Sequence, residues 1–297
     1  MITTNSINIE LTKKCNLNCS YCYLSCGMKE RRSLKKMDVF DFLERFSESG
    51  RYVMFTGGEI FTLDYIDDVL RFAYDCGLQI SIFTNGTLAM SHQKAISDYV
   101  FKVNTSLDGT RSINDALRGT TFDKVNTFLQ WLSESGIQHT VQSMVTPASF
   151  VVKEELYETL VRYSPSEVKL AHITQMGRGT SNPDILNDNQ IYDMVSMSEE
   201  FSERTNYKIM FSTNLVDKHI FEEVLKPNLH RLSPWLQSDG SISMMQSDLG
   251  KLKISDITSF PLCNDNYEGF IDKMRSYQIE KSNKYYDIME IVRDLFD

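Results

Sequence analysis

The stretch that decides the fold is Cys15-Asn16-Leu17-Asn18-Cys19-Ser20-Tyr21-Cys22-Tyr23-Leu24-Ser25-Cys26, which directly follows an extended apolar segment, residues 7–11. Three of the six cysteines in the chain, Cys15, Cys19 and Cys22, share a C-x3-C-x2-C spacing. A loop this short can place three thiolates around one small inorganic cluster. Because iron–sulfur clusters normally take four cysteine ligands, three thiolates leave one iron open.

An open iron can be chelated by a small molecule, so the spacing favours a catalytic cluster over a simple electron carrier. With the aromatic Tyr21 before the last cysteine, the motif resembles that of the radical S-adenosylmethionine (radical SAM) superfamily. The resemblance implies one [4Fe–4S] cluster, held by Cys15, Cys19 and Cys22, whose open iron binds the amino and carboxylate groups of SAM. It also implies cleavage of SAM to a 5′-deoxyadenosyl radical that takes hydrogen from the substrate, with the protein aiming the cofactor's chemistry.

Two other interpretations of the cysteines remain open. With Cys26 included, four thiolates suffice for a closed structural zinc site, although zinc ligand pairs usually come from separated turns. A disulfide is less favoured, because the chain starts Met1-Ile2-Thr3-Thr4 and shows no basic segment followed by an apolar one that would argue for export. We therefore expect a cytoplasmic protein.

Composition places the 297-residue chain among ordinary globular proteins, with 41% hydrophobic and 24% charged residues. The sequence contains no run of about 18 apolar residues, so no membrane span is expected. The formal charge of −9 argues against broad binding to nucleic acid, which depends on Lys and Arg surfaces. We expect neither nucleic acid nor membrane as a partner.

Short apolar stretches alternate with amphipathic helical ones between residues 7 and 212, as in βαβ units with a parallel sheet. The expected strands are 7–11, 52–55, 79–83, 102–106, 138–144 and 167–172, with a weaker one at 208–211. Gly77 and Gly136 stand where helices are expected to end. The pattern predicts an α/β fold, a partial (β/α)6 TIM-like barrel over residues 1–212, which the radical SAM resemblance also implies. Residues 213–297 are expected to form a small α+β cap.

Active sites of such barrels lie at the carboxyl ends of the strands, and suggestive residues follow the first four expected strands. Gly57-Gly58-Glu59 follows the second strand and resembles the family's GGE motif, whose backbone and carboxylate receive the SAM amino group. Asn85 follows the third and is expected to contact SAM. Ser106 and Asp108 end the fourth and are, by resemblance, candidates for the ribose hydroxyls or the carboxylate of SAM. Asp108 is equally suited to cap the next helix.

Two later segments resemble those of peptide-modifying radical SAM enzymes. Asn114-Asp115-Ala116-Leu117-Arg118-Gly119 is similar to a His-Asp-x-x-Arg-Gly segment, although Asn114 replaces the histidine. Arg118 suits a two-pronged contact with the SAM carboxylate; a solvated surface arginine is the alternative. Gln175-Met176-Gly177-Arg178-Gly179 is similar to a loop near the adenine, where Met176 would supply an apolar wall.

The segment from Trp235 to Leu252 resembles the start of a SPASM or twitch extension, which carries additional iron–sulfur clusters. Met244 and Met245 stand where its cysteine is expected, so we predict one cluster only. Cys76 lies on an apolar helix face and is expected to be a small buried hydrophobe. Cys263 is either the hydrogen donor that the resemblance to peptide epimerases implies or a buried structural thiol.

The sequence thus predicts a single-cluster radical SAM enzyme. A ribosomally made peptide is the leading substrate, to be cross-linked, epimerised or oxidised, although no peptide-recognition domain precedes the cysteine loop. A sugar, nucleoside or amino acid is the second possibility, and a structural zinc-binding interaction protein is the competing class. The expected partner is an electron donor such as flavodoxin or ferredoxin.

Overall fold

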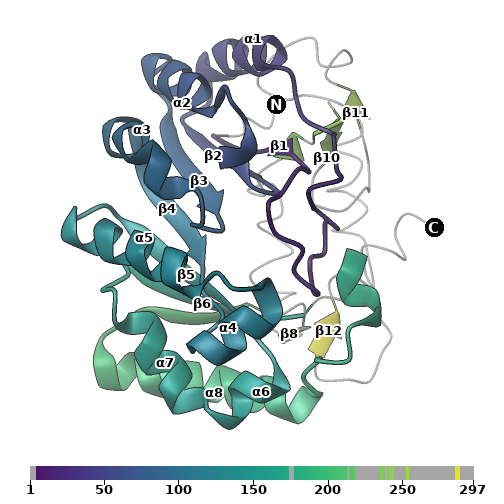
Figure 1. The fold of residues 1–297 in the computed structure, drawn as a ribbon, viewed down its shortest axis with the longest axis vertical. Coiled ribbons are helices and arrows are strands. Elements are labelled where there is room, and N and C mark those ends of the chain that lie inside the picture. The colour runs from purple at the N-terminus through teal and green to yellow at the C-terminus, as the bar shows by residue number, and fades with distance from the viewer. Residues whose placement is uncertain are drawn as a thin grey trace.

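The computed structural model describes residues 5–173 and 177–212, together with the short pieces 215–217, 235–236, 238–239, 241–243, 252–253 and 285–287. One large sheet organises these residues (Figure 1), in the order β11-β10-β9-β1-β2-β3-β4-β5-β6-β7. From β1 to β7 every neighbouring pair is parallel. The strands therefore end at one common edge, where the loops that follow them meet.

The strands and helices have the following bounds. The strands are β1 Ser6–Thr12, β2 Tyr52–Gly57, β3 Gln79–Thr84, β4 Val100–Ser106, β5 His139–Val145, β6 Glu167–His172, β7 Ile209–Ser212, β8 Leu215–Asp217, β9 Trp235–Leu236, β10 Ser241–Ser243, β11 Leu252–Lys253 and β12 Tyr285–Asp287. The α-helices are α1 Lys36–Ser47, α2 Ile66–Asp75, α3 Gln93–Tyr99, α4 Arg111–Arg118, α5 Phe122–Glu134, α6 Pro147–Val151, α7 Lys153–Val161 and α8 Asp188–Thr205, and the 3-10 helices are η1 Ile60–Thr62, η2 Ala89–His92 and η3 Gly177–Ser181.

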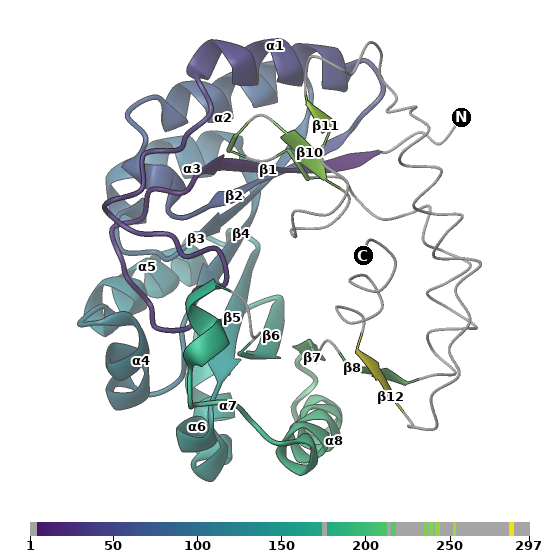
Figure 2. The same cartoon turned by 90° about the vertical axis from the view of Figure 1, so that its right-hand side faces the viewer.

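The helices form an arc on the outer side of the curved sheet (Figure 2). Side chains of a strand alternate between its two faces, and one set packs with the helices in the core. This set includes Ile9, Val103 and Val168, which lie in the same buried cluster as Phe42 and Phe128 of the helices. The residues between them face the inner side of the sheet. That inner set is largely polar: Asn8, Glu10, Lys102, Asn104, Thr140, Gln142, Glu167 and Lys169.

The predicted α/β architecture is confirmed, and each expected strand from β1 to β7 occurs within about two residues of its expected bounds. Gly77 and Gly136 have φ of +77° and +65°, the left-handed conformation expected where α2 and α5 end. No helix within the described residues has both the length and the apolar character needed to cross a bilayer.

The beginning of the C-terminal segment pairs with the barrel sheet. Strand β9 runs parallel to β1, with Asn8 beside Trp235, and β10 pairs antiparallel with β9. A buried hydrogen bond joins the Ser238 hydroxyl to the Glu10 carboxylate on β1. The proposed domain boundary after residue 212 stays a prediction. Met244, Met245 and Cys263 lie outside the described residues.

Candidate active site at the cysteine loop

The cysteine loop leaves the end of β1 and is closed by its own returning strand. The backbone NH of Cys15 donates to the Gly27 carbonyl over 3.2 Å, and the NH of Gly27 donates to the Lys13 carbonyl over 3.3 Å. Cys15 and Cys19 are buried, and Cys22 is partly exposed. The three thiols thus belong to one fixed loop at the edge where the strands end.

Glycines after β2 allow that loop to lie directly against the chain. The NH of Gly58 donates to the Thr12 carbonyl over 2.7 Å, and the NH of Glu59 donates to the Lys14 carbonyl over 2.9 Å. A Cβ at position 58 would lie 2.3 Å from the Lys14 oxygen, and one at Gly57, whose φ is +142°, would lie 2.3 Å from the Thr12 oxygen. Only glycine fits at both positions, so the Gly-Gly pair is needed for the loop to dock here.

Glu59 is fully buried beside this contact, and the donors to its carboxylate that come from described residues are all uncharged. These are the backbone NH of Asn85 at 2.7 Å, the Thr84 hydroxyl at 2.9 Å and the backbone NH of Phe61 at 3.1 Å. Burial raises the pKa of Glu59 to about 7, although these donors act in the opposite direction.

Asn85 connects Glu59 to the cysteine loop. Its side-chain amide donates to the side-chain oxygen Oδ1 of Asn16 over 2.9 Å and contacts the Cys15 sulfur at 3.8 Å. The hydroxyl of Thr87, which accepts from the Asn16 side chain at 2.8 Å, donates back to the Asn85 oxygen. Residues that follow β1, β2 and β3 are therefore joined in one hydrogen-bonded group.

Asp108, after β4, forms a second buried carboxylate site and is 0% exposed. Arg118 donates to it from Nε at 2.6 Å and from Nη2 at 3.3 Å, and the backbone NH of Met144 donates over 2.9 Å. The Tyr21 hydroxyl donates to the same carboxylate, and the Arg118 guanidinium lies over the Tyr21 ring, 5.4 Å from its centroid. Through Tyr21, this site holds the middle of the cysteine loop.

The short helix η3 holds the loop from its other side, and both views show it beside the loop (Figures 1 and 2). Arg178 donates from Nε to the Cys19 carbonyl at 2.8 Å and from its backbone NH to the Cys22 carbonyl at 3.0 Å. A Cβ at Gly177, whose φ is +55°, would lie 2.2 Å from the Tyr23 oxygen. The segment for which the sequence predicts a place near adenine thus also supports the cysteine loop, and its predicted role toward adenine stays a prediction.

The loop's donor set fits an iron–sulfur cluster better than a single ion. Three thiols come from one loop, and the Cys15 sulfur already accepts a hydrogen bond from the Leu17 NH at 3.4 Å. Such NH–S contacts are among the features that tune cluster potentials. Within the described residues no three His, Cys, Asp or Glu side chains converge on one metal ion.

The structure excludes one alternative each for Asp108 and Arg118, while their predicted contacts with SAM stay predictions. Asp108 does not cap α4, because Thr110 occupies that position. Arg118 is not a solvated surface residue, since its side chain is 10% exposed. Ser106 is partly exposed beside Gln142 on β5, and Cys76, at the end of α2, packs partly buried against the core.

Some contributing residues were not predicted. Thr84 binds Glu59, Asn16 binds Asn85, and Arg178 binds the loop carbonyls. Position at a strand end was an available signal for Thr84. For Arg178 the contact spans 159 positions of sequence, and no local pattern shows it. Met176 lies outside the described residues, so its predicted role, like that of Cys263, stays a prediction.

Comparison with known proteins identifies the family. A family model described as the radical SAM superfamily matches residues 9–160, just over half of the chain. The chain belongs to the radical SAM superfamily. Members of this superfamily use a [4Fe–4S] cluster together with SAM, as the cysteine motif predicts.

Relatives by sequence differ in how much of the chain they match. The mycofactocin maturase MftC of Mycobacterium tuberculosis (strain CDC 1551 / Oshkosh) is 31% identical over 204 residues, 64% of this chain and 51% of MftC. The chain therefore spans about half the length of that relative. An S-adenosylmethionine-dependent nucleotide dehydratase of Flammeovirga pacifica is 22% identical over 294 residues, 92% of this chain and 95% of the dehydratase.

The fold is that of solved radical SAM proteins. Streptococcus suis SuiB bound to the precursor peptide SuiA matches with a TM-score of 0.74 and 16% identity, covering 95% of this chain and 69% of SuiB. At this identity the match shows the fold alone, a partial TIM-like barrel. MftC and SuiB are SPASM-type members, which supports the SPASM/twitch-related subgroup predicted from the motifs.

Proposed function

We propose that this chain is a radical SAM enzyme that cleaves SAM reductively at a single cluster and takes a hydrogen atom from a peptide. One observation carries the proposal: the cysteine loop, the Gly57-Gly58-Glu59 segment and Asn85 form one hydrogen-bonded group at the carboxyl ends of the strands. The bound cluster and SAM would supply the electron and the radical.

The residues of the chain hold and orient these cofactors. Cys15, Cys19 and Cys22 are proposed to ligate the cluster. The carboxylate of Glu59 is buried, and no described residue gives it a cationic partner, so a cation placed beside it would be strongly favoured. The ammonium of SAM is such a cation, and we assign Glu59 as its acceptor, with Gly57 and Gly58 letting the cysteine loop dock beside it.

Arg118 is proposed to contact the SAM carboxylate through the part of its guanidinium that remains available. Nε and Nη2 are engaged by Asp108, whereas no described residue accepts from Nη1. Asp108 and Tyr21 orient the guanidinium, and Ser106, partly exposed at the same edge, is proposed for the ribose hydroxyls. Asn85 would place its amide against SAM near the Cys15 sulfur.

A peptide is the proposed substrate class. One relative is named a maturase, and SuiB, which shares the fold, is solved bound to a precursor peptide, SuiA. The nucleotide dehydratase, however, matches nearly the whole chain, so nucleotides belong in every substrate assay as a comparison.

Anaerobic purification with iron and zinc analysis, followed by dithionite reduction with SAM, tests the proposal. We expect about four irons per chain and formation of 5′-deoxyadenosine. Cys19→Ala should lose both cluster and cleavage, while the control Cys76→Ala, outside the loop, should keep them. Zinc without cleavage would contradict the proposal, and about eight irons would show a second cluster.

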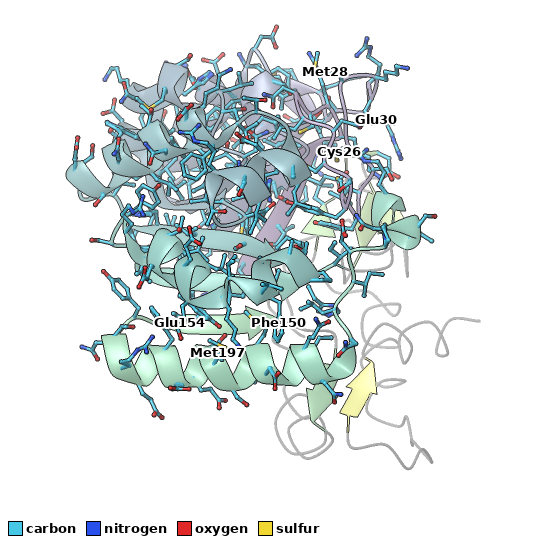
Figure 3. All side chains as sticks on the ribbon, turned by 60° about the horizontal axis from the view of Figure 1, so that its bottom comes forward. Cys26, Met28, Glu30, Phe150, Glu154 and Met197 are labelled. Carbon is cyan, nitrogen blue, oxygen red and sulfur yellow. The ribbon has the colours of Figure 1, made fainter. Side chains whose placement is uncertain are left out.

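The electron donor is proposed to dock beside the loop on a basic surface, defined by the exposed side chains of Lys29, Arg31, Arg32 and Lys35. With Glu30 as the only acidic residue among residues 13–36, this segment carries a formal +6 in a chain of −9. Figure 3 shows Cys26, Met28 and Glu30 together at this corner. Such a surface favours an acidic partner, as flavodoxins and ferredoxins commonly are. A reducing cytoplasm is the proposed setting.

Replacing Arg31 and Arg32 by Glu separates docking from chemistry. We expect 5′-deoxyadenosine formation driven by reduced flavodoxin to fall about tenfold and to lose most of its salt dependence. Formation driven by dithionite should stay unchanged. A Lys94→Glu control on α3 should leave both rates unchanged, and equal loss in both assays would contradict docking at this surface.

A further inference from the structure

The inner side of the sheet carries a group of lysines around one carboxylate. Glu167, at the start of β6 and 6% exposed, accepts contacts from Lys208 at 2.7 Å, Lys102 at 3.4 Å and Lys169 at 3.7 Å. Burial raises the pKa of Glu167, but the three lysines lower it by more, so the pKa lies below its ordinary value. One negative charge therefore faces three positive ones, which leaves an excess of two positive charges.

Strand register places this group on the inner wall, away from the helices. Val103 of β4 and Val168 of β6 belong to the helix-side core, so their neighbours Lys102, Glu167 and Lys169 project to the opposite face. Lys102 and Lys169 are 22% and 36% exposed. They are reachable from the barrel interior rather than from the outer surface.

Further polar groups on β5 complete the wall between these lysines. In register, Thr140 pairs with Glu167, and Gln142 pairs with Lys169. The Thr140 hydroxyl is buried and has no hydrogen-bond partner among the described residues. A buried hydroxyl without a partner is uncommon and points to a ligand or water that would satisfy it.

We propose that Lys102, Lys169 and Lys208 form a subsite for an anionic group of the substrate, a carboxylate or a phosphate, on the inner wall of the barrel. The excess charge beside the uncharged donors of Thr140 and Gln142 suits such a group. This inference rests on the proposed function, because it takes the barrel interior as the substrate site.

The subsite lies below the candidate SAM site at a useful distance. Ala171 pairs with Met144, whose NH donates to Asp108. Lys169 precedes Ala171 by two residues, about 7 Å along the strand, and Glu167, at the centre of the lysine group, precedes Ala171 by four residues, about 13 Å. An anion held there anchors one end of a substrate while another part reaches the strand ends where hydrogen transfer is proposed.

Calorimetric titration of the purified protein with three probes tests the subsite: inorganic tripolyphosphate, CTP and a triglutamate peptide. We expect at least one to bind, and Lys169→Met and Lys102→Met each to weaken that probe about tenfold. Glu167→Gln should strengthen it several-fold, because the internal competing anion is removed. Lys94→Met, which removes an equal charge from the outer surface, is the control.

Each outcome is decisive. Binding of triglutamate identifies an acidic peptide as the source of the anion, and binding of tripolyphosphate or CTP alone identifies a phosphate-bearing molecule. Failure of all three probes to bind, or equal affinities in wild type, Lys169→Met and Glu167→Gln, would overturn the subsite. Because titration requires no SAM cleavage, a failure of the subsite stays distinguishable from a failure of the proposed chemistry.

Discussion

Two buried carboxylates lie at the same edge of the sheet, and they are satisfied in different ways. Asp108 is paired with the guanidinium of Arg118 and also accepts from Tyr21 and Met144. Glu59 accepts from the backbone of Asn85 and other uncharged groups and has no cationic partner among the described residues. The two sites hold adjacent parts of the cysteine loop.

The two sites differ in their counter-charge: the chain supplies one to Asp108, whereas no described residue supplies one to Glu59. At Asp108 the protein supplies its own counter-charge, so the main role of this carboxylate is to orient Arg118 and Tyr21. At Glu59 the counter-charge is missing, and burial instead raises the pKa. A buried carboxylate of the second kind is prepared for a cationic ligand, which is the basis of its assignment to the SAM ammonium.

The largest effect on stability is expected from Arg118→Met. This change leaves Asp108 buried without its counter-charge, and breaking such a pair typically costs about 3–5 kcal/mol of unfolding free energy. Urea unfolding monitored by circular dichroism measures the loss. Arg118→Met combined with Asp108→Asn should recover part of it, and a loss below about 1 kcal/mol would show that the pair is unimportant for the fold.

The second prediction concerns pH and Glu59. Its folded pKa of about 7 lies above the ordinary value of 4.5, so the folded chain binds this proton more tightly than the unfolded chain does. The contribution to stability is therefore complete below pH 4.5, declines between pH 4.5 and 7, and is lost above pH 7. The slope for a single proton is at most about 1.4 kcal/mol per pH unit.

Comparing wild type with Glu59→Gln isolates the contribution of the Glu59 carboxyl group to the pH dependence of stability. In the absence of SAM, wild-type stability should fall relative to the variant across this pH range, as measured by urea titrations at several pH values. Added SAM should flatten the difference, because its ammonium would favour the ionised carboxylate. Parallel pH profiles for the two proteins without SAM would show that Glu59 is not the titrating group.

The third prediction is a loss of unfolding free energy in Tyr21→Phe. The hydroxyl donates to the charged Asp108, and hydrogen bonds to charged groups contribute about 1.5–3 kcal/mol. We expect a loss near the lower end, about 1.5 kcal/mol, because Arg118 and Met144 continue to satisfy the carboxylate. Tyr163→Phe, whose hydroxyl donates to the neutral Asn126 at 2.7 Å, is a matched control that should cost less.

Local patterns predicted the sheet and the Glu59 site well. Strands were visible as apolar runs, and Gly57-Gly58-Glu59 and Asn85 directly follow two of them. The docking of the glycines needs only neighbouring strand ends, which parallel pairing brings together. The sequence therefore contained most of this site.

The Asp108 site was less accessible to sequence reasoning. Asp108 and Arg118 were each identified, but as separate contacts to SAM, and their mutual pairing was not predicted. Tyr21 lies 87 positions away from Asp108, and Arg178 lies 159 positions from the carbonyl that it binds. Such contacts depend on how α4 and η3 pack against the loop, which neither spacing nor composition encodes.

The smallest expected effect comes from Arg111→Met, which compares an exposed arginine with the buried Arg118 of the same helix. Arg111, on the same helix α4, pairs with Asp123 of α5, but the two side chains are 56% and 75% exposed. An exposed pair is expected to contribute about 0.5 kcal/mol or less, since solvent and salt screen it. Arg111→Met should thus change the urea midpoint little, and added salt should remove the remaining difference. If Arg111→Met instead cost as much as Arg118→Met, burial would not explain the contrast between the two arginines, and the role given to the Asp108 site would have to be withdrawn.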